Sequence, residues 1–140
     1  MLYRYNNKEL DLLGRIMRAE AIGEGQNGML LVGNVVTNRI LADCDVFTNL
    51  RTLDDVIYQQ NAFASTDSPL FFERATEKEK QLARKAFNGF RQIPAYRALW
   101  FYAPRPGEEC LPHWFNQRNS GRYKGHCFYE PDSGMCPAIH

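Results

Sequence analysis

A helix that is apolar on almost every side is the strongest constraint on the fold of this chain. Residues 28–40 carry apolar side chains spread around a helix, at Met29, Leu30, Val32, Val35, Val36 and Ile40. A helix of this kind is typical of the buried centre of a small domain. The chain has 140 residues, so we expect a single domain over residues 1–140 built around this helix. Its polar stripe, Asn34 and Asn38, must find hydrogen-bond partners inside the domain.

An earlier helix places a carboxylate on an apolar face. Asn6 is a capping residue, and Glu9 stands three residues later, where it completes a capping box. The inward stripe that follows has the spacing i, i+3, i+4 and i+7, and consists of Leu13, Ile16, Met17 and Glu20. Gly23 and Gly25 end the helix, so Glu20 is expected in its last turn. A carboxylate on an inward face must be solvated, paired or protonated.

Further signals predict a mainly α (α+β) fold with a small, irregular β part. Thr52 and Thr76 begin capping boxes, which predict helices over residues 52–58 and 76–88. The short aromatic runs 98–102 and 126–129 are bounded by proline and glycine, and are typical of strands. The intervening segment 104–123 is expected to be rich in loops.

Charge and composition exclude several classes of protein. The chain has 17 basic and 16 acidic residues, a net charge of +1, and nucleic acid is therefore not expected as a partner. No apolar run approaches the roughly 18 residues of a membrane span. The first residues lack the apolar core and cleavage site of a secretory signal. We therefore expect synthesis in a cytoplasm, without a signal peptide and without a membrane span.

The four cysteines, Cys44, Cys110, Cys127 and Cys136, form no CxxC pair. Without a secretory signal, reduced and buried thiols are the first expectation. The alternative is a disulfide between two of the three late cysteines. A third alternative, a metal site that combines these cysteines with His113 and His126, matches no standard spacing of zinc ligands, so no metal and no cofactor is predicted.

The carboxylate on the first helix suits carbohydrate chemistry. A glycosidic oxygen leaves poorly until it is protonated, and burial raises the pKa of a carboxyl group enough to hold a proton near neutral pH. Aromatic rings offer flat faces to sugars, and Asn or Gln amides bind hydroxyl and N-acetyl groups. The alternative is that Glu20 is a helix-end glutamate that reaches into solvent.

Several motifs extend this interpretation. They are Arg18-Ala19-Glu20-Ala21 with Gly23-Glu24-Gly25, the run 28–39, Ile57-Tyr58-Gln59 with Ala62-Phe63, Leu99-Trp100-Phe101-Tyr102 with Pro104, Trp114-Phe115-Asn116-Gln117, and His126-Cys127-Phe128-Tyr129. Together they resemble the SleB/CwlJ family of cell-wall hydrolases over residues 10–136. The run 28–34, the Ala62-Phe63 pair and the four cysteines are similar to the CwlJ branch. Where the SleB branch has Gln-Phe-Ser, this chain has Ala62-Phe63-Ala64, so details of the SleB site are not carried over there.

The resemblance implies a fold, a substrate and a setting. The fold would be a lysozyme-like, lytic-transglycosylase-like domain, and its catalytic acid would fall on Glu20. The activity would be lysis of the spore cortex during germination, on peptidoglycan that contains muramic lactam. The enzyme would be made in the mother-cell cytoplasm and held in the spore coat, at the outer boundary of the cortex. It would depend on a coat protein of the GerQ type and respond to calcium dipicolinate.

Two reactions remain open for such a site. In both, Glu20 protonates the oxygen between N-acetylmuramic acid and N-acetylglucosamine. Attack by the sugar's own 6-hydroxyl gives 1,6-anhydromuramic acid and needs one carboxylate. Attack by water needs a second carboxylate, and Glu24 is the one close in sequence. Because Gly23 is expected to end the helix before Glu24, we favour the transglycosylase-type reaction with Glu24 organising the loop.

Candidate substrate-binding residues are Glu24, Asn38, Phe63, Tyr102 and His126. His113 is interpreted as a solvent-facing loop histidine. A different class of function, a non-catalytic coat or peptidoglycan-binding protein with the same fold, is disfavoured by the presence of Glu20.

Overall fold

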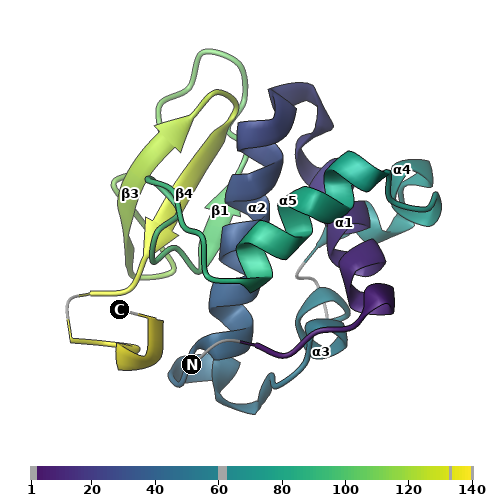
Figure 1. The fold of residues 1–140 in the computed structure, drawn as a ribbon. Helices are drawn as coiled ribbons and strands as arrows, with labels where there is room; N and C mark the ends of the chain where they lie inside the picture. Colours follow the sequence, from purple (N-terminus) through teal and green to yellow (C-terminus); the bar gives the residue numbers. More distant parts are fainter. Residues whose placement is uncertain (1–2, 60–62, 133, 140) are drawn as a thin grey trace.

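The computed structural model of the chain describes residues 3–59, 63–132 and 134–139. Ala62 of the family motif therefore lies outside the described residues. α2 (Gly25–Leu41) runs through the centre of the molecule, between a group of helices and a β-sheet (Figure 1). α1 (Asn7–Ala21) and α5 (Glu77–Phe87) both pack on α2 and on each other.

The central helix is confirmed. Every residue from 28 to 40 is buried, as the all-round apolar pattern predicts, although the helix begins earlier, at Gly25. Gly33 lets the neighbouring helices approach closely, because a Cβ atom there would lie 3.0 Å from Met17 Sδ and 3.3 Å from Ala86 Cβ. The core of the helical body therefore forms where α1, α2 and α5 meet.

The three predicted capping boxes are also confirmed. They begin α1, α3 (Leu53–Ile57) and α5, and their pairs are Asn6 with Glu9, Thr52 with Asp55, and Thr76 with Glu79. Each box involves residues three apart in sequence, and is therefore visible without tertiary information. Along α1 the apolar stripe is fully buried, whereas Glu20 in the last turn is only partly buried.

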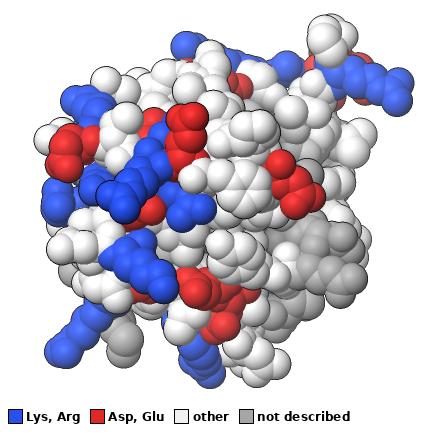
Figure 2. All heavy atoms as spheres, turned by 90° about the vertical axis from the view of Figure 1, so that its right-hand side faces the viewer, with Lys and Arg blue, Asp and Glu red and all other residues white. Residues whose placement is uncertain are grey.

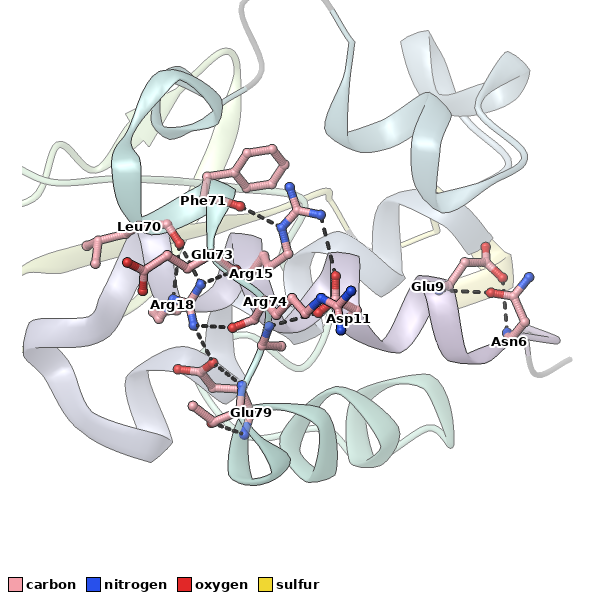
Figure 3. A network of polar contacts seen from close by, with 12 residues as sticks. Asn6, Glu9, Asp11, Arg15, Arg18, Leu70, Phe71, Glu73, Arg74 and Glu79 are labelled. Carbon is pink, nitrogen blue, oxygen red and sulfur yellow. Dashed lines mark hydrogen bonds and ion pairs between the residues drawn. The ribbon is translucent and has the colours of Figure 1, made fainter.

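A buried arginine attaches α1 to the segment that precedes α5 (Figure 3). Arg18 donates hydrogen bonds to the carbonyl oxygens of Leu70, Glu73 and Arg74, and to Glu79 Oε1 at 2.8 Å. This segment includes α4 (Pro69–Phe72), a short helix that the sequence analysis did not predict. Because Arg18 lies in the same turn as Glu20, these bonds also fix the end of α1.

Within the described residues, the sheet has four antiparallel strands in the order β1-β4-β3-β2. The strands are β1 (Trp100–Tyr102), β2 (His113–Trp114), β3 (Gln117–Tyr123) and β4 (His126–Glu130). Both predicted aromatic strands are present as β1 and β4, and they pair directly, with Phe101 opposite Phe128.

The prediction of a loop-rich segment 104–123 is wrong in its second half, because β2 and β3 lie there. β3 is mostly polar, and a bulge between Asn119 and Gly121 shifts its pairing with β4. Both features hide the alternation of apolar and polar residues that identifies a strand in sequence. His113 is exposed as expected, although it belongs to β2.

The expectation of reduced thiols is wrong, because all four cysteines form disulfides. Cys110 pairs with Cys127, with Cα atoms 5.7 Å apart, which confirms the late disulfide that was the alternative. Cys44 pairs with Cys136 across 92 residues, a pairing that was not predicted. The cysteine and histidine metal site, the third alternative above, therefore has no free thiol to serve as a ligand.

The face that lies to the right in Figure 1 carries basic and acidic side chains intermingled (Figure 2). This mixture agrees with the nearly balanced charge of the chain. Within the described ranges, no helix combines the length and apolarity needed to cross a bilayer.

Candidate active site

Two glutamates lie at the junction between α1 and α2. Glu20 is in the last turn of α1, and Glu24 is in the single turn of 3-10 helix that joins the two helices (Ile22–Glu24). α2 begins at Gly25, where φ is +76°, a value that favours glycine. The sequence therefore places both carboxylates at one end of the helical body.

Glu24 connects this junction to the sheet. Its Oε1 lies 2.6 Å from His126 Nδ1, and its Oε2 accepts the backbone N–H of Gly125 at 2.7 Å. Both side chains are largely buried, at 11% exposed for His126 and 13% for Glu24. Both carboxylate oxygens of Glu24 are thus engaged, across more than 100 residues of sequence. This agrees with the interpretation of Glu24 as a residue that organises the loop.

Aromatic rings continue the site from His126. The His126 ring packs edge-on against Phe101 of β1, with ring centres 5.4 Å apart. Phe101 in turn lies 6.2 Å from Phe63. These rings come from β4, β1 and the segment after α3, so only the folded chain brings them together.

A buried cation, Arg39, completes a cluster around Glu20. Its other members are Glu24, Phe63, Phe101 and His126. Arg39 of α2 donates from Nε to the carbonyl oxygen of Leu99 at 2.7 Å, and its guanidinium carbon lies 5.0 Å from the Phe63 ring centre. Burial lowers the pKa of Arg39 to about 10, and the negative charge of Glu20 opposes this shift. Arg39 is therefore a cation at neutral pH, and its charge acts on Glu20.

Glu20 itself is partly exposed, and its carboxylate makes no hydrogen bond or ion pair within the part of the chain that the structure describes. Its electrostatic partner is Arg39. A carboxyl group that is partly buried, charge-coupled and otherwise unoccupied can exchange a proton with a ligand. Glu24, in contrast, is already bound at both oxygens.

The structure gathers four of the six predicted site residues, Glu20, Glu24, Phe63 and His126, and places the other two elsewhere. Asn38 is buried, its Nδ2 donates to the carbonyl oxygens of Ala95 and Ala98, and its Oδ1 accepts from Arg91 Nε. Its amide therefore holds the chain before β1, outside the cluster around Glu20, and a role in binding a sugar stays a prediction.

Tyr102 also lies outside this cluster, and its role in binding substrate likewise stays a prediction. Its hydroxyl accepts the backbone N–H of Leu111 at 3.0 Å, and its ring stacks on Tyr129 with ring centres 5.7 Å apart. Neighbouring residues of a strand point to opposite faces, so Tyr102 cannot share the face of Phe101. Phe101 and Arg39 are the cluster residues that the sequence analysis missed. Strand alternation could have identified Phe101, whereas nothing local in the sequence marks Arg39.

Comparison with known proteins identifies the family. The sequence profile described as Cell Wall Hydrolase matches residues 23–129. The chain is 44% identical to the cell wall hydrolase CwlJ of Oceanobacillus iheyensis over 97% of its own length and 96% of that protein. It is also 44% identical to CwlJ of Bacillus subtilis, over 98% of this chain and 95% of that protein.

Solved structures show the same fold. The catalytic domain of the Bacillus cereus SleB protein superposes with a TM-score of 0.71 and 20% identity, covering 91% of this chain and 93% of that one. The catalytic domain of the germination-specific lytic transglycosylase SleB from Bacillus anthracis also gives a TM-score of 0.71, at 18% identity, covering 93% and 100%. The fold is therefore lysozyme-like, as predicted.

The chain belongs to the cell wall hydrolase family. It is a peptidoglycan-cleaving enzyme, and the two curated relatives named above are CwlJ proteins.

Proposed function

We propose that this chain is a spore cortex-lytic enzyme, which cleaves the glycan strand between N-acetylmuramic acid and N-acetylglucosamine during germination. Residues 1–140 act as one catalytic domain, and Glu20 is its general acid and base. The observation that carries this proposal is the contrast between the two glutamates. The Glu20 carboxylate is unoccupied among the described residues and coupled to Arg39, whereas Glu24 is bound at both oxygens.

In the proposed reaction, Glu20 gives its proton to the glycosidic oxygen as the bond to C1 breaks. The 6-hydroxyl of the same muramic residue then attacks C1, and its proton passes to the Glu20 carboxylate. The products are a 1,6-anhydromuramic end and a free N-acetylglucosamine hydroxyl, and the acid is restored. The positive charge of Arg39 acts on this carboxylate during both transfers.

The aromatic part of the cluster binds the substrate in this proposal. The exposed edge of the His126 ring meets the sugar, and Glu24 holds His126 in place through the 2.6 Å contact. The Phe63 ring is buried and packs inside the cluster. Phe101 packs against both rings. Glu24 therefore contributes to binding through His126.

A hydrolytic reaction is the second candidate. It is favoured by the position of Glu24, which lies in the same cluster as Glu20 and could serve as a second carboxylate. In this mechanism Glu24 would have to release His126 or Gly125 in order to act on a water molecule. The contacts at both of its oxygens are the reason that we favour the transglycosylase-type reaction.

The location, the protein partner and the activating signal of the enzyme are proposed from the family alone. The enzyme would act at the boundary between the spore coat and the cortex, together with a coat protein of the GerQ type, and calcium dipicolinate would be its signal.

The substrate proposal predicts selective lysis. We expect the purified chain to clear suspensions of isolated cortex peptidoglycan and to leave vegetative peptidoglycan, which lacks muramic lactam, largely intact. Loss of turbidity measures both reactions under the same conditions. Equal rates on the two materials, or clearing of the vegetative material alone, would contradict the cortex as the substrate.

A further inference from the structure

A pocket of about 350 Å³ lies beside β1, next to the Cys44–Cys136 disulfide. The residues that line it are Cys44, Trp100, Asn116, Gln117, Pro131, Asp132, Met135 and Cys136. None of them belongs to the cluster around Glu20. Its volume is within the range of sites for small organic ligands.

A buried hydrogen-bond acceptor in this pocket has no partner. Oε1 of Gln117 is buried and accepts no hydrogen bond within the described residues. The amide nitrogen of the same side chain donates a long bond, of 3.4 Å, to the carbonyl oxygen of Phe115. An unpaired buried acceptor costs stability. A ligand that offers an N–H or O–H group would remove this cost if the Gln117 amide turns toward the pocket that it lines.

An exposed aromatic platform lies at the same place. Phe115 and Asn116 form the tip of the hairpin between β2 and β3, with φ angles of 52° and 63°. Bulky residues rarely adopt such angles, and here the conformation leaves Phe115 65% exposed. Its ring centre lies 6.5 Å from that of Trp100, which lines the pocket.

The charge of the pocket selects among ligands. Asp132 is the charged residue among the described lining residues, and its side chain is exposed. A carboxylate accepts hydrogen bonds from hydroxyl groups and repels acidic ligands. The pocket thus combines a flat apolar face, an amide acceptor and a carboxylate, which together match a neutral sugar that carries hydroxyl and acetamido groups.

We propose that this pocket is a second saccharide-binding site, which takes an uncharged N-acetylated sugar of the glycan strand. The ring of the sugar packs on Phe115 and Trp100, and an acetamido N–H or a hydroxyl group donates to Gln117 Oε1. This inference rests on the proposed function, because it assumes a glycan substrate. A second site holds the enzyme on an insoluble polymer without taking part in the reaction.

The test is titration of full-length protein with the trimer of N-acetylglucosamine, followed by NMR. The protein carries Glu20→Gln so that the ligand is not consumed. We expect shifts at residues of the pocket. Gln117→Met removes the unpaired acceptor and should weaken binding about fivefold, the effect of one ordinary hydrogen bond. Phe115→Ala should weaken it by a similar factor, about fivefold, through loss of the aromatic face.

The matched control is Phe72→Ala, because Phe72 is 66% exposed and lies in α4, away from the pocket. It should leave binding unchanged. Gln117→Met should also leave thermal stability unchanged or raised, whereas a merely structural role for Gln117 predicts a loss. Absence of trimer binding, shifts confined to the cluster around Glu20, or equal affinities in all variants would overturn the second site. In each of these cases the wild-type protein would still lyse cortex, so the proposed function would remain supported.

Discussion

Replacing Glu20 by glutamine should lower the rate of cortex lysis by about 10²–10⁴-fold, the usual contribution of a general acid and base. Glutamine keeps the size and shape of the side chain but has no proton to exchange. The carboxylate makes no hydrogen bond within the described residues, so the change removes little from the fold. The rate is measured as loss of turbidity of isolated cortex, and thermal unfolding reports whether the variant is folded.

Glu77→Gln is the matched control for this change. Glu77 is also at a helix end, but its side chain is 87% exposed and its ion-pair partner is Lys80, at 3.8 Å. This variant should retain the wild-type rate. A Glu20→Gln protein that clears cortex nearly as fast as the wild type would contradict the assignment of Glu20 as the catalytic acid.

The largest expected effect on stability follows from loss of the buried Arg18. Arg18→Met should lower the free energy of unfolding by about 3–5 kcal/mol, the usual result of removing one partner of a buried ion pair. The Glu79 carboxylate would keep its bond to the Thr76 N–H but lose its cation. The carbonyl oxygens of Leu70, Glu73 and Arg74 would lose their donor as well. Urea-induced unfolding measures the difference.

Arg15→Met is the control for this second change. Arg15 lies one turn earlier on α1 and binds Asp11, but that pair is more than 20% exposed at both side chains. Its loss should cost about 1–2 kcal/mol, through one hydrogen bond to Phe71 and a weak surface ion pair. Equal losses of unfolding free energy in the two variants would show that burial of Arg18 adds nothing to its contribution to stability (Figure 3).

The parts of the fold that the sequence predicts are those determined by residues close together in the chain. The capping boxes at Asn6, Thr52 and Thr76 each need only a partner three residues away. The central helix can also be predicted from the sequence, because a helix that is buried on all sides requires apolar residues on all sides. Within the site, Glu20 could be identified as a candidate catalytic residue, because it places a charged side chain on an otherwise apolar stripe of the helix.

The parts that could not be predicted depend on contacts between distant residues. The role of Arg39 requires the positions of Leu99 and Phe63, and the Cys44–Cys136 pair spans 92 residues. Asn38 shows why a site residue is hard to identify from sequence. Its amide is buried and fully used in holding the chain before β1, a role that looks the same in sequence as a role in binding a sugar.

The contact between Glu24 and His126 bears on the choice between the two reactions. If Glu24 serves only to hold His126, its carboxylate is not needed for proton transfer, and Glu24→Gln can still bind the Gly125 N–H through its amide oxygen. The 6-hydroxyl is tethered to the ring that it attacks, so its effective concentration far exceeds that of a water molecule without a base.

The mass of the fragments released from cortex by the wild-type enzyme and by Glu24→Gln tests the central claim most directly. We expect both proteins to release fragments that end in 1,6-anhydromuramic acid, each lighter by one water than the hydrolytic product, with Glu24→Gln only modestly slower. Fragments with ordinary reducing ends, together with a Glu24→Gln protein as inactive as Glu20→Gln, would show instead a hydrolase that uses both carboxylates.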